Sequence, residues 1–307
     1  MASITAPRLL AARSARRRGV LSGRWGAVLL ILPAVAAFCF LFVYPMVGVV
    51  TESVTLPEAG IGNYVSLFSD GYTVRIMVRT FWVALMVAVA AIVLAFPYAY
   101  LMTICGPKWA AVLMTVVLIP FWSNATAKNF GLLVLFQRDG IVDQFMSFFG
   151  VHYPLVGTTP GVMIAMVQVM LPFAVLPLYA RLGQINRRLL DAAQGLGATR
   201  TKSFWRIYVP LSMPGVAASF TLVFILALGF YITPAMLGSP QESLIAQLIM
   251  ARLEVILDFG GAAAIGVVLL VATLGILGLS QLMSSRLAAG RGRAATGESV
   301  KSIGGGL

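Results

Sequence analysis

The chain has 307 residues, of which 60% are apolar and only 10% are Asp, Glu, Lys or Arg. Soluble domains carry about 25% charged residues, so this composition excludes a soluble enzyme and predicts an all-α membrane protein. The net charge of +12 would favour nucleic acid as the partner of a soluble protein, but here the basic residues lie between apolar runs, and we expect no nucleic-acid partner.

Six apolar stretches are long enough to cross about 30 Å of hydrocarbon at 1.5 Å per residue. Basic residues precede the first stretch as in a signal peptide, but it is longer than an h-region, and we expect it to be retained. The remaining parts are two basic tails without apolar periodicity, 1–24 and 286–307, which we expect to be flexible flanks of a transmembrane domain over 25–285. The predicted spans are 26–50, 80–104, 109–134, 160–182, 215–237 and 261–285.

The basic residues divide unequally between the two sides of a six-span chain. One side carries 17 of them, including both tails, and the other side carries 5. Because cytoplasmic loops are enriched in Lys and Arg, the sequence predicts a multi-pass protein of the plasma (inner) membrane with both termini in the cytoplasm. The five basic residues on the outer side are Arg75, Arg79, Lys128, Arg138 and Arg252.

Ionisable side chains are nearly absent from the six spans, so we expect no catalytic residues, no metal site and no proton relay there. Prolines are frequent, and polar or aromatic side chains gather beside several of them. Such groups could line a path for a polar or cationic solute, or they could form hydrogen bonds between helices, and the sequence leaves both interpretations open. The candidate path residues are Trp122, Asn124, Gln168, Phe173, Phe230, Tyr231 and Thr233.

The long basic loop 183–214 carries its own helix signals. Asn186 is a candidate cap for one short helix, and Gly197 is a natural stop for it. Thr199 is a candidate cap for a second short helix, which we expect to end before Pro210. The first helix would carry an apolar stripe with a basic rim, which suits either the groove of a partner protein or the surface of the inner leaflet.

A motif in this loop resembles the EAA loop of ABC importer permeases, whose pattern is E-A-A, three residues, G, nine residues and I-x-L-P. The spacing agrees at every position, with Asp in place of Glu and Val209 in place of Leu. The resemblance implies that this loop couples the permease to a cytoplasmic ATP-binding-cassette ATPase. The residues that carry it are Asp191, Ala192, Ala193, Gly197, Ile207 and Pro210.

The resemblance extends over about residues 26–285, and within the family the sequence is most similar to the spermidine/putrescine type of permease. It implies a type I ABC importer permease (MetI-like) bundle in membrane lipid, with an ATPase dimer that binds ATP and Mg²⁺, and with no cofactor in the chain itself. It also implies a dimeric channel, either a homodimer or, as the resemblance favours, a heterodimer with a second permease subunit. An extracytoplasmic solute-binding protein would meet the outer loops, including 141–149. The solute would be a polyamine or a related small polar or cationic compound, and the alternative is an ATP-independent secondary transporter or channel. The motifs are Asn63-Tyr64 with Leu67-Phe68, Pro120-Phe121-Trp122, Arg138-Asp139-Gly140, Leu171-Pro172-Phe173 with Leu176-Pro177-Leu178, and Thr233-Pro234 with Leu237-Gly238.

Overall fold

The computed structural model describes residues 24–150 and 152–303, with side chains from 31 to 282 in those ranges. The described part of the chain is helical and contains no strand. The helices are α1 (Arg24–Phe38), α2 (Tyr44–Thr55), α3 (Gly62–Ser69), α4 (Gly71–Ile104), α5 (Pro107–Trp122), α6 (Ala125–Phe136), α7 (Ile141–Phe148), α8 (Thr159–Leu182), α9 (Arg188–Gly195), α10 (Arg200–Ser203), α11 (Val209–Leu228), α12 (Ile232–Leu237), α13 (Ile245–Ala251) and α14 (Phe259–Ile303).

Five of the described helical segments are long and apolar enough to cross a membrane. A sixth span exists only if two helices that meet at an angle of 98° are counted together. The all-α membrane architecture is therefore confirmed, and the predicted number of six depends on this bent pair. The five segments are Ile31–Thr55, Gly71–Ile104, Thr159–Leu182, Arg200–Leu228 and Phe259–Leu282, and the bent pair is Pro107–Trp122 with Ala125–Phe148.

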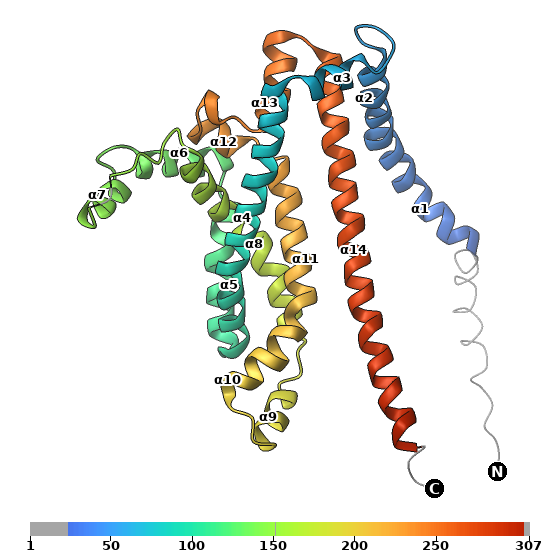
Figure 1. The fold of residues 1–307 in the computed structure, drawn as a ribbon, viewed down its shortest axis with the longest axis vertical. Coiled ribbons are helices and arrows are strands. Elements are labelled where there is room, and N and C mark those ends of the chain that lie inside the picture. The colour runs from blue at the N-terminus through green and yellow to red at the C-terminus, as the bar shows by residue number, and fades with distance from the viewer. Residues whose placement is uncertain (1–23, 151, 304–307) are drawn as a thin grey trace, which may run out of the picture.

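Helices α4, α8 and α11 pack together as the centre of the bundle, and α5 lies against α4 and α8 (Figure 1). One face of α4 consists of alanines spaced by three or four residues, and each of them is fully buried. Side chains this small let neighbouring helices approach closely, which is the main way that helices associate in lipid. The alanines are Ala84, Ala88, Ala91, Ala95 and Ala99.

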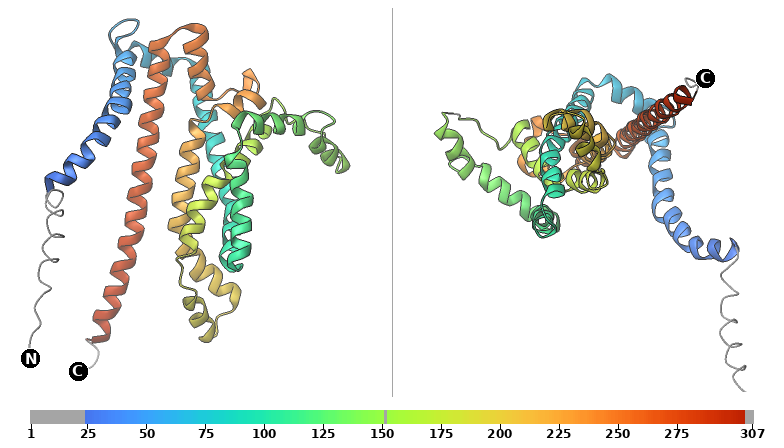
Figure 2. Two further views of the ribbon diagram at one scale, coloured as in Figure 1. Left: turned by 180° about the vertical axis from the view of Figure 1, so that it is seen from behind. Right: turned by 90° about the horizontal axis from the view of Figure 1, so that it is seen from below.

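Helices α1, α2 and α14 lie to one side of this bundle (Figures 1 and 2). The contacts of α2 with the rest of the chain are mainly to α14, and most apolar side chains of the segment from Ile31 onward are exposed. Helix α14 continues to Ile303, so the structure has a helix through most of the stretch 286–307, which the sequence predicted as a flexible tail. The first predicted tail, 1–24, lies outside the described residues except for Arg24.

Among the prolines that lie inside continuous helices, two follow a π-helical turn. The turn Cys39–Val43 precedes Pro45, and the turn Phe204–Tyr208 precedes Pro210. A proline has no amide hydrogen, and its ring collides with the carbonyl group four residues earlier, so a widened turn at that place gives the ring room. The prediction that the second loop helix ends before Pro210 is wrong, because the helix continues from Arg200 to Leu228.

The third and fifth predicted spans, 109–134 and 215–237, are also wrong in detail. Helix α5 ends at Trp122, and Ser123 is extended with ψ of 146°. Asn124 then caps α6, since its Oδ1 accepts the N–H groups of Thr126 and Ala127 at 2.8 and 3.2 Å. Helix α11 likewise ends at Leu228, and the following residues form the separate short helix α12. Hydropathy alone reads both stretches as continuous, and a capping side chain interrupts the first of them at Asn124.

Candidate functional site

Helix α9 lies at one end of the bundle, away from α13, and both of its ends are defined by local hydrogen bonds (Figure 1). At its start, the Oδ1 atom of Asn186 accepts the N–H of Arg188 at 3.1 Å. At its end, Gly197 has a φ of +90°, and the N–H of Ala198 donates to the carbonyl of Ala193 at 3.0 Å. This is a Schellman ending, which favours glycine because side chains disfavour positive φ. The predicted stop at Gly197 is confirmed.

The motif residues of α9 lie on its surface. Asp191 and Ala192 are exposed, and Ala193 is half-buried. Leu196, at the end of the predicted apolar stripe, has 90% of its surface exposed, and Leu189 is also exposed. A water-facing leucine this open contributes little to the stability of its own chain. The helix therefore presents a small and apolar surface that another molecule can contact closely.

The segment that follows α9 is held firmly to α4 by aromatic rings. Tyr208 is buried, and its ring centroid lies 5.2 Å from that of Tyr100 and 5.5 Å from that of Phe204. A guanidinium nitrogen of Arg187 also donates to the carbonyl oxygen of Thr103, near the end of α4. The loop is thus attached to the bundle on both sides of α9, while α9 itself projects from it.

Ile207 and Pro210 lie in the helix that follows α9. Thr199 caps the start of this helix, because its hydroxyl oxygen accepts the N–H of Lys202 at 3.3 Å. The predicted cap at Thr199 is confirmed. Both residues border an open groove of about 380 Å³ that also includes a side chain of α9. The second part of the motif therefore meets α9 at Leu189, which is not itself a motif residue. The groove is lined by Leu189, Arg206, Ile207, Pro210 and Leu211.

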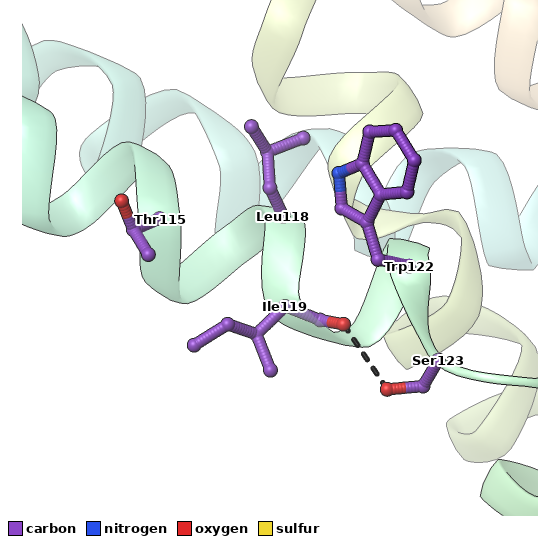
Figure 3. A pocket seen from close by; sticks show the side chains of 5 residues that line it. All are labelled: Thr115, Leu118, Ile119, Trp122 and Ser123. Carbon is purple, nitrogen blue, oxygen red and sulfur yellow. Dashed lines mark hydrogen bonds between the residues drawn. The ribbon is translucent and has the colours of Figure 1, made fainter.

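Two of the candidate path residues, Trp122 on α5 and Phe173 on α8, each lie beside the ring of Phe121. The ring of Phe121 is 5.5 Å from that of Phe173 and 6.1 Å from that of Trp122. Trp122 has 82% of its surface exposed and borders a hollow of about 470 Å³ along α5 (Figure 3). The hollow is lined by Thr115, Leu118, Ile119, Trp122 and Ser123.

The polar candidates occupy different surroundings. Asn124 is exposed and serves as the cap of α6. The Oε1 atom of Gln168 on α8 is buried and has no hydrogen-bond partner among the described residues. A buried amide oxygen without a partner is unfavourable in the bundle, and a polar solute or a water molecule could satisfy it.

Thr233 makes a hydrogen bond between helices. It is fully buried, and its hydroxyl pairs at 2.7 Å with the Oδ1 atom of Asn129, which is fully buried as well. Asn129 was not predicted, although an amide inside the apolar α6 is the signal that could have found it. Phe230 is half-buried and Tyr231 is exposed, at the break between α11 and α12. The structure therefore does not bring the candidate path residues together at a single place.

A polar network that the sequence did not indicate joins α4 to α14 at the end opposite α9. The hydroxyl of Thr73 donates to Asp70 at 2.6 Å and accepts from Arg252 at 3.2 Å. Arg252 also forms an ion pair with Asp258 at 3.2 Å, and Asp258 accepts the N–H of Gly261 at 2.8 Å. The hydrogen bond from Thr73 lowers the pKa of Asp70 below its ordinary value, because it stabilises the carboxylate form.

Comparison with known families decides what kind of protein carries this arrangement. Residues 109–288 match the family described as the binding-protein-dependent transport system inner membrane component. The chain belongs to this family. The match includes α9 with its motif, and the permease therefore lies in the inner membrane, as predicted.

Relatives of the permease include the spermidine/putrescine transport system permease protein PotB of Escherichia coli K12, 30% identical over 228 residues, which are 73% of this chain and 82% of the relative. The protein of the same name from Haemophilus influenzae is 30% identical over 219 residues, 70% of this chain and 76% of the relative. A crystal structure of a bacterial alginate ABC transporter, in complex with alginate pentasaccharide-bound periplasmic protein, has a chain with the same fold. Its TM-score is 0.70 at 21% identity, over 86% of this chain and 95% of that one. The chain is an ABC importer permease, and the alternative of a secondary transporter or channel is not favoured.

Proposed function

We propose that the permease imports a polyamine or a related small organic cation. The observation that carries this proposal is the 30% identity, over 73% of the chain, to proteins named for spermidine and putrescine transport. The aromatic rings of Phe121, Trp122 and Phe173 support it, because aromatic faces attract organic cations.

Transport would be driven by a partner ATPase dimer that binds ATP and Mg²⁺, so that this chain hydrolyses nothing and needs no cofactor. Its docking element is α9, with Asp191, Ala192, Ala193 and Gly197 at the contact. Ile207 and Pro210 would hold the following helix in place behind it. The exposure of Leu196 at the tip of α9 supports this role, because an apolar side chain in water is stabilised when a partner covers it.

The orientation follows from the charges, with both termini and α9 in the cytoplasm. Arg187, Arg188, Arg200, Lys202 and Arg206 surround α9 and are all exposed. The opposite end, which holds the network of Asp70 and Asp258, would face outward. This arrangement agrees with the general excess of basic residues in cytoplasmic loops.

Two further partners complete the transporter. This chain and a second permease subunit would form a heterodimer and enclose the path between them. The candidate path residues of this chain lie at separate places, so the path needs the second subunit. An extracytoplasmic solute-binding protein would deliver the solute to the outer loops. Gln168, Phe173, Phe230, Tyr231 and Thr233, with Trp122 and Asn124, are the proposed contributions of this chain to the path.

The test is ATP hydrolysis by the assembled transporter in liposomes, with the ATPase, the second permease and the binding protein. We expect Gly197→Asp to abolish the stimulation by solute-loaded binding protein, because the φ of +90° disfavours a side chain and the end of α9 would change. Gly106→Asp is the matched control, since Gly106 has a φ of −62° at the start of α5 and open space around it.

The two parts of the proposal fail separately. Equal stimulation in the Gly197→Asp transporter and the wild type, with both complexes intact, would reject α9 as the coupling element and return it to the inner-leaflet interpretation. If another solute stimulates ATP hydrolysis and spermidine and putrescine do not, the polyamine assignment is rejected and the coupling role of α9 stands.

A further inference from the structure

Helix α7 exposes a row of large apolar side chains. Phe145 has 66% of its surface exposed and Phe148 has 84%, and Ile141 and Phe149 are similarly open. At 100° per residue these four side chains fall within an arc of about 100° around the helix axis. The rings of Phe145 and Phe149 are 5.2 Å apart, so the row forms one continuous aromatic surface.

The other sides of α7 are already occupied. Val142 and Met146 are partly buried and pack against the main core of the protein. On the polar side, a carboxylate oxygen of Asp143 accepts the N–H of Asp139 at 3.0 Å, and Gln144 donates to the carbonyl of Asp139 at 2.8 Å. These contacts hold α7 in place and do not involve its aromatic side chains. The aromatic surface is therefore available to contact another molecule.

The position of α7 along the membrane normal follows from the length of α5. With 16 residues, α5 rises about 24 Å, which is less than the roughly 30 Å of a hydrocarbon core. The chain then turns by 98°, and α6 and α7 run across the direction of the spans (Figures 1 and 2). The arm formed by α6 and α7 therefore lies near the boundary between hydrocarbon and headgroups, on the side of the membrane opposite α9.

The two helices that precede α7 also expose large apolar side chains. On α5 the exposed apolar side chains include Val112 and Val116, and on α6 they include Phe130 and Val134. A span exposes such residues to hydrocarbon, and aromatic residues are enriched where hydrocarbon meets the headgroups. Exposed apolar side chains on three consecutive helices, one of them part of a candidate span, favour lipid as the molecule that covers α7.

We propose that α7 is an in-plane membrane helix that inserts Phe145, Phe148 and Phe149 into the outer leaflet at the level of the headgroup boundary. This inference rests on the proposed orientation with α9 in the cytoplasm. The polar side of α7, with Asp143, faces the aqueous outer compartment, where a binding protein can reach it. Inserted in this way, α7 anchors α6, whose Asn129 is bonded to Thr233 of α12.

The experiment measures which medium reaches each side of α7. The sequence has only two cysteines, Cys39 and Cys105, so both are changed to serine. A nitroxide label is then placed in the Phe148→Cys or Ser147→Cys variant, since Ser147 is on the polar side of the same helix turn. The labelled permease is assembled into the complete transporter in phosphatidylethanolamine and phosphatidylglycerol vesicles, and collision rates with oxygen and with a water-soluble nickel chelate are measured.

At position 148 we expect oxygen collisions to exceed nickel collisions several-fold, and we expect the ratio to reverse at position 147. Nickel access that is equal at the two positions would overturn the proposal, because α7 would then lie in water. A label at 148 that is shielded from both reagents in the transporter, but not in the permease alone, would also overturn it, because a protein partner would then cover the surface. Neither measurement depends on solute or ATP, so failure here is distinct from failure of the proposed function.

Discussion

The hydrogen bond between Asn129 and Thr233 permits a sharp test of how the two short helices α6 and α12 are held together. Both side chains are fully buried, and the Nδ2 atom of Asn129 already donates to the carbonyl of Ala125 at 3.0 Å. Thr233→Val keeps the shape of the side chain but leaves the Oδ1 atom of Asn129 without this donor. In soluble proteins a stranded buried acceptor costs about 1–3 kcal/mol, whereas hydrogen bonds between membrane helices contribute about 0.6 kcal/mol on average and about 1.7 kcal/mol at most. We therefore expect the free energy of unfolding to fall by about 1 kcal/mol.

The measurement is a double-mutant cycle with Thr233→Val and Asn129→Leu, using unfolding by sodium dodecyl sulfate in mixed micelles. We expect a coupling energy between about 0.6 and 1.7 kcal/mol. Thr273→Val is the control, because the hydroxyl of Thr273 donates at 2.7 Å only within its own helix, to the carbonyl of Leu269, and its loss should change stability by less than about 0.5 kcal/mol. Additive effects of the two cycle mutations would refute the reasoning, since no bond would then connect α6 to α12.

Two further predictions concern the space around a glycine and the effect of acid. Gly161→Ala should destabilise the permease by about 1–3 kcal/mol, because the added carbon would overlap the carbonyl oxygen of Leu155. Gly266→Ala is the control and should be neutral or stabilising, because Gly266 lies in open space on α14. Thermal unfolding of both variants in detergent checks this prediction, and equal melting temperatures of the two variants would contradict it. Because the hydrogen bond from Thr73 lowers the pKa of Asp70 in the folded protein, its stabilising effect should be present above the unfolded pKa of about 3.9 and lost as the pH falls through the lower folded value. The melting temperature of the wild type should therefore drop more between pH 5 and pH 3 than that of Asp70→Asn, and parallel curves would argue against it.

Local signals explain why the α9 region could be predicted from the sequence. Gly197 ends α9 and Thr199 caps the next helix, and both effects depend on residues within four positions in the chain. The motif spacing reflects the same short-range geometry, since a turn at Gly197 and the first turns of the next helix separate α9 from Ile207 and Pro210. Such features need no knowledge of tertiary packing.

The missed features depend on contacts that are distant in the sequence. Asn129 and Thr233 are 104 residues apart, and Arg252 reaches Thr73 over 179 residues. Average hydropathy also did not predict the break in the third span, because the stretches before Ser123 and after Lys128 are both apolar. The break depends on the extended backbone of Ser123 and on the capping bonds of Asn124. Hydropathy is averaged along the chain, so it does not detect hydrogen bonds between polar side chains of different helices.

The error at Pro210 changes the mechanical interpretation of the loop. A helix that ended there would leave flexible backbone between the motif and the membrane, and a displacement of α9 would be absorbed before it reached the span. The continuous helix from Arg200 to Leu228 instead joins the two directly, and the π-helical turn that accommodates Pro210 is braced against α4 by the rings of Tyr100, Phe204 and Tyr208. A movement of α9 would therefore reach the break before α12 through the short turn 196–199 and one continuous helix. Since packed helices shift as units and do not deform continuously, the same construction would carry a change at the ATPase side to the Asn129 and Thr233 contact at the other side of the membrane.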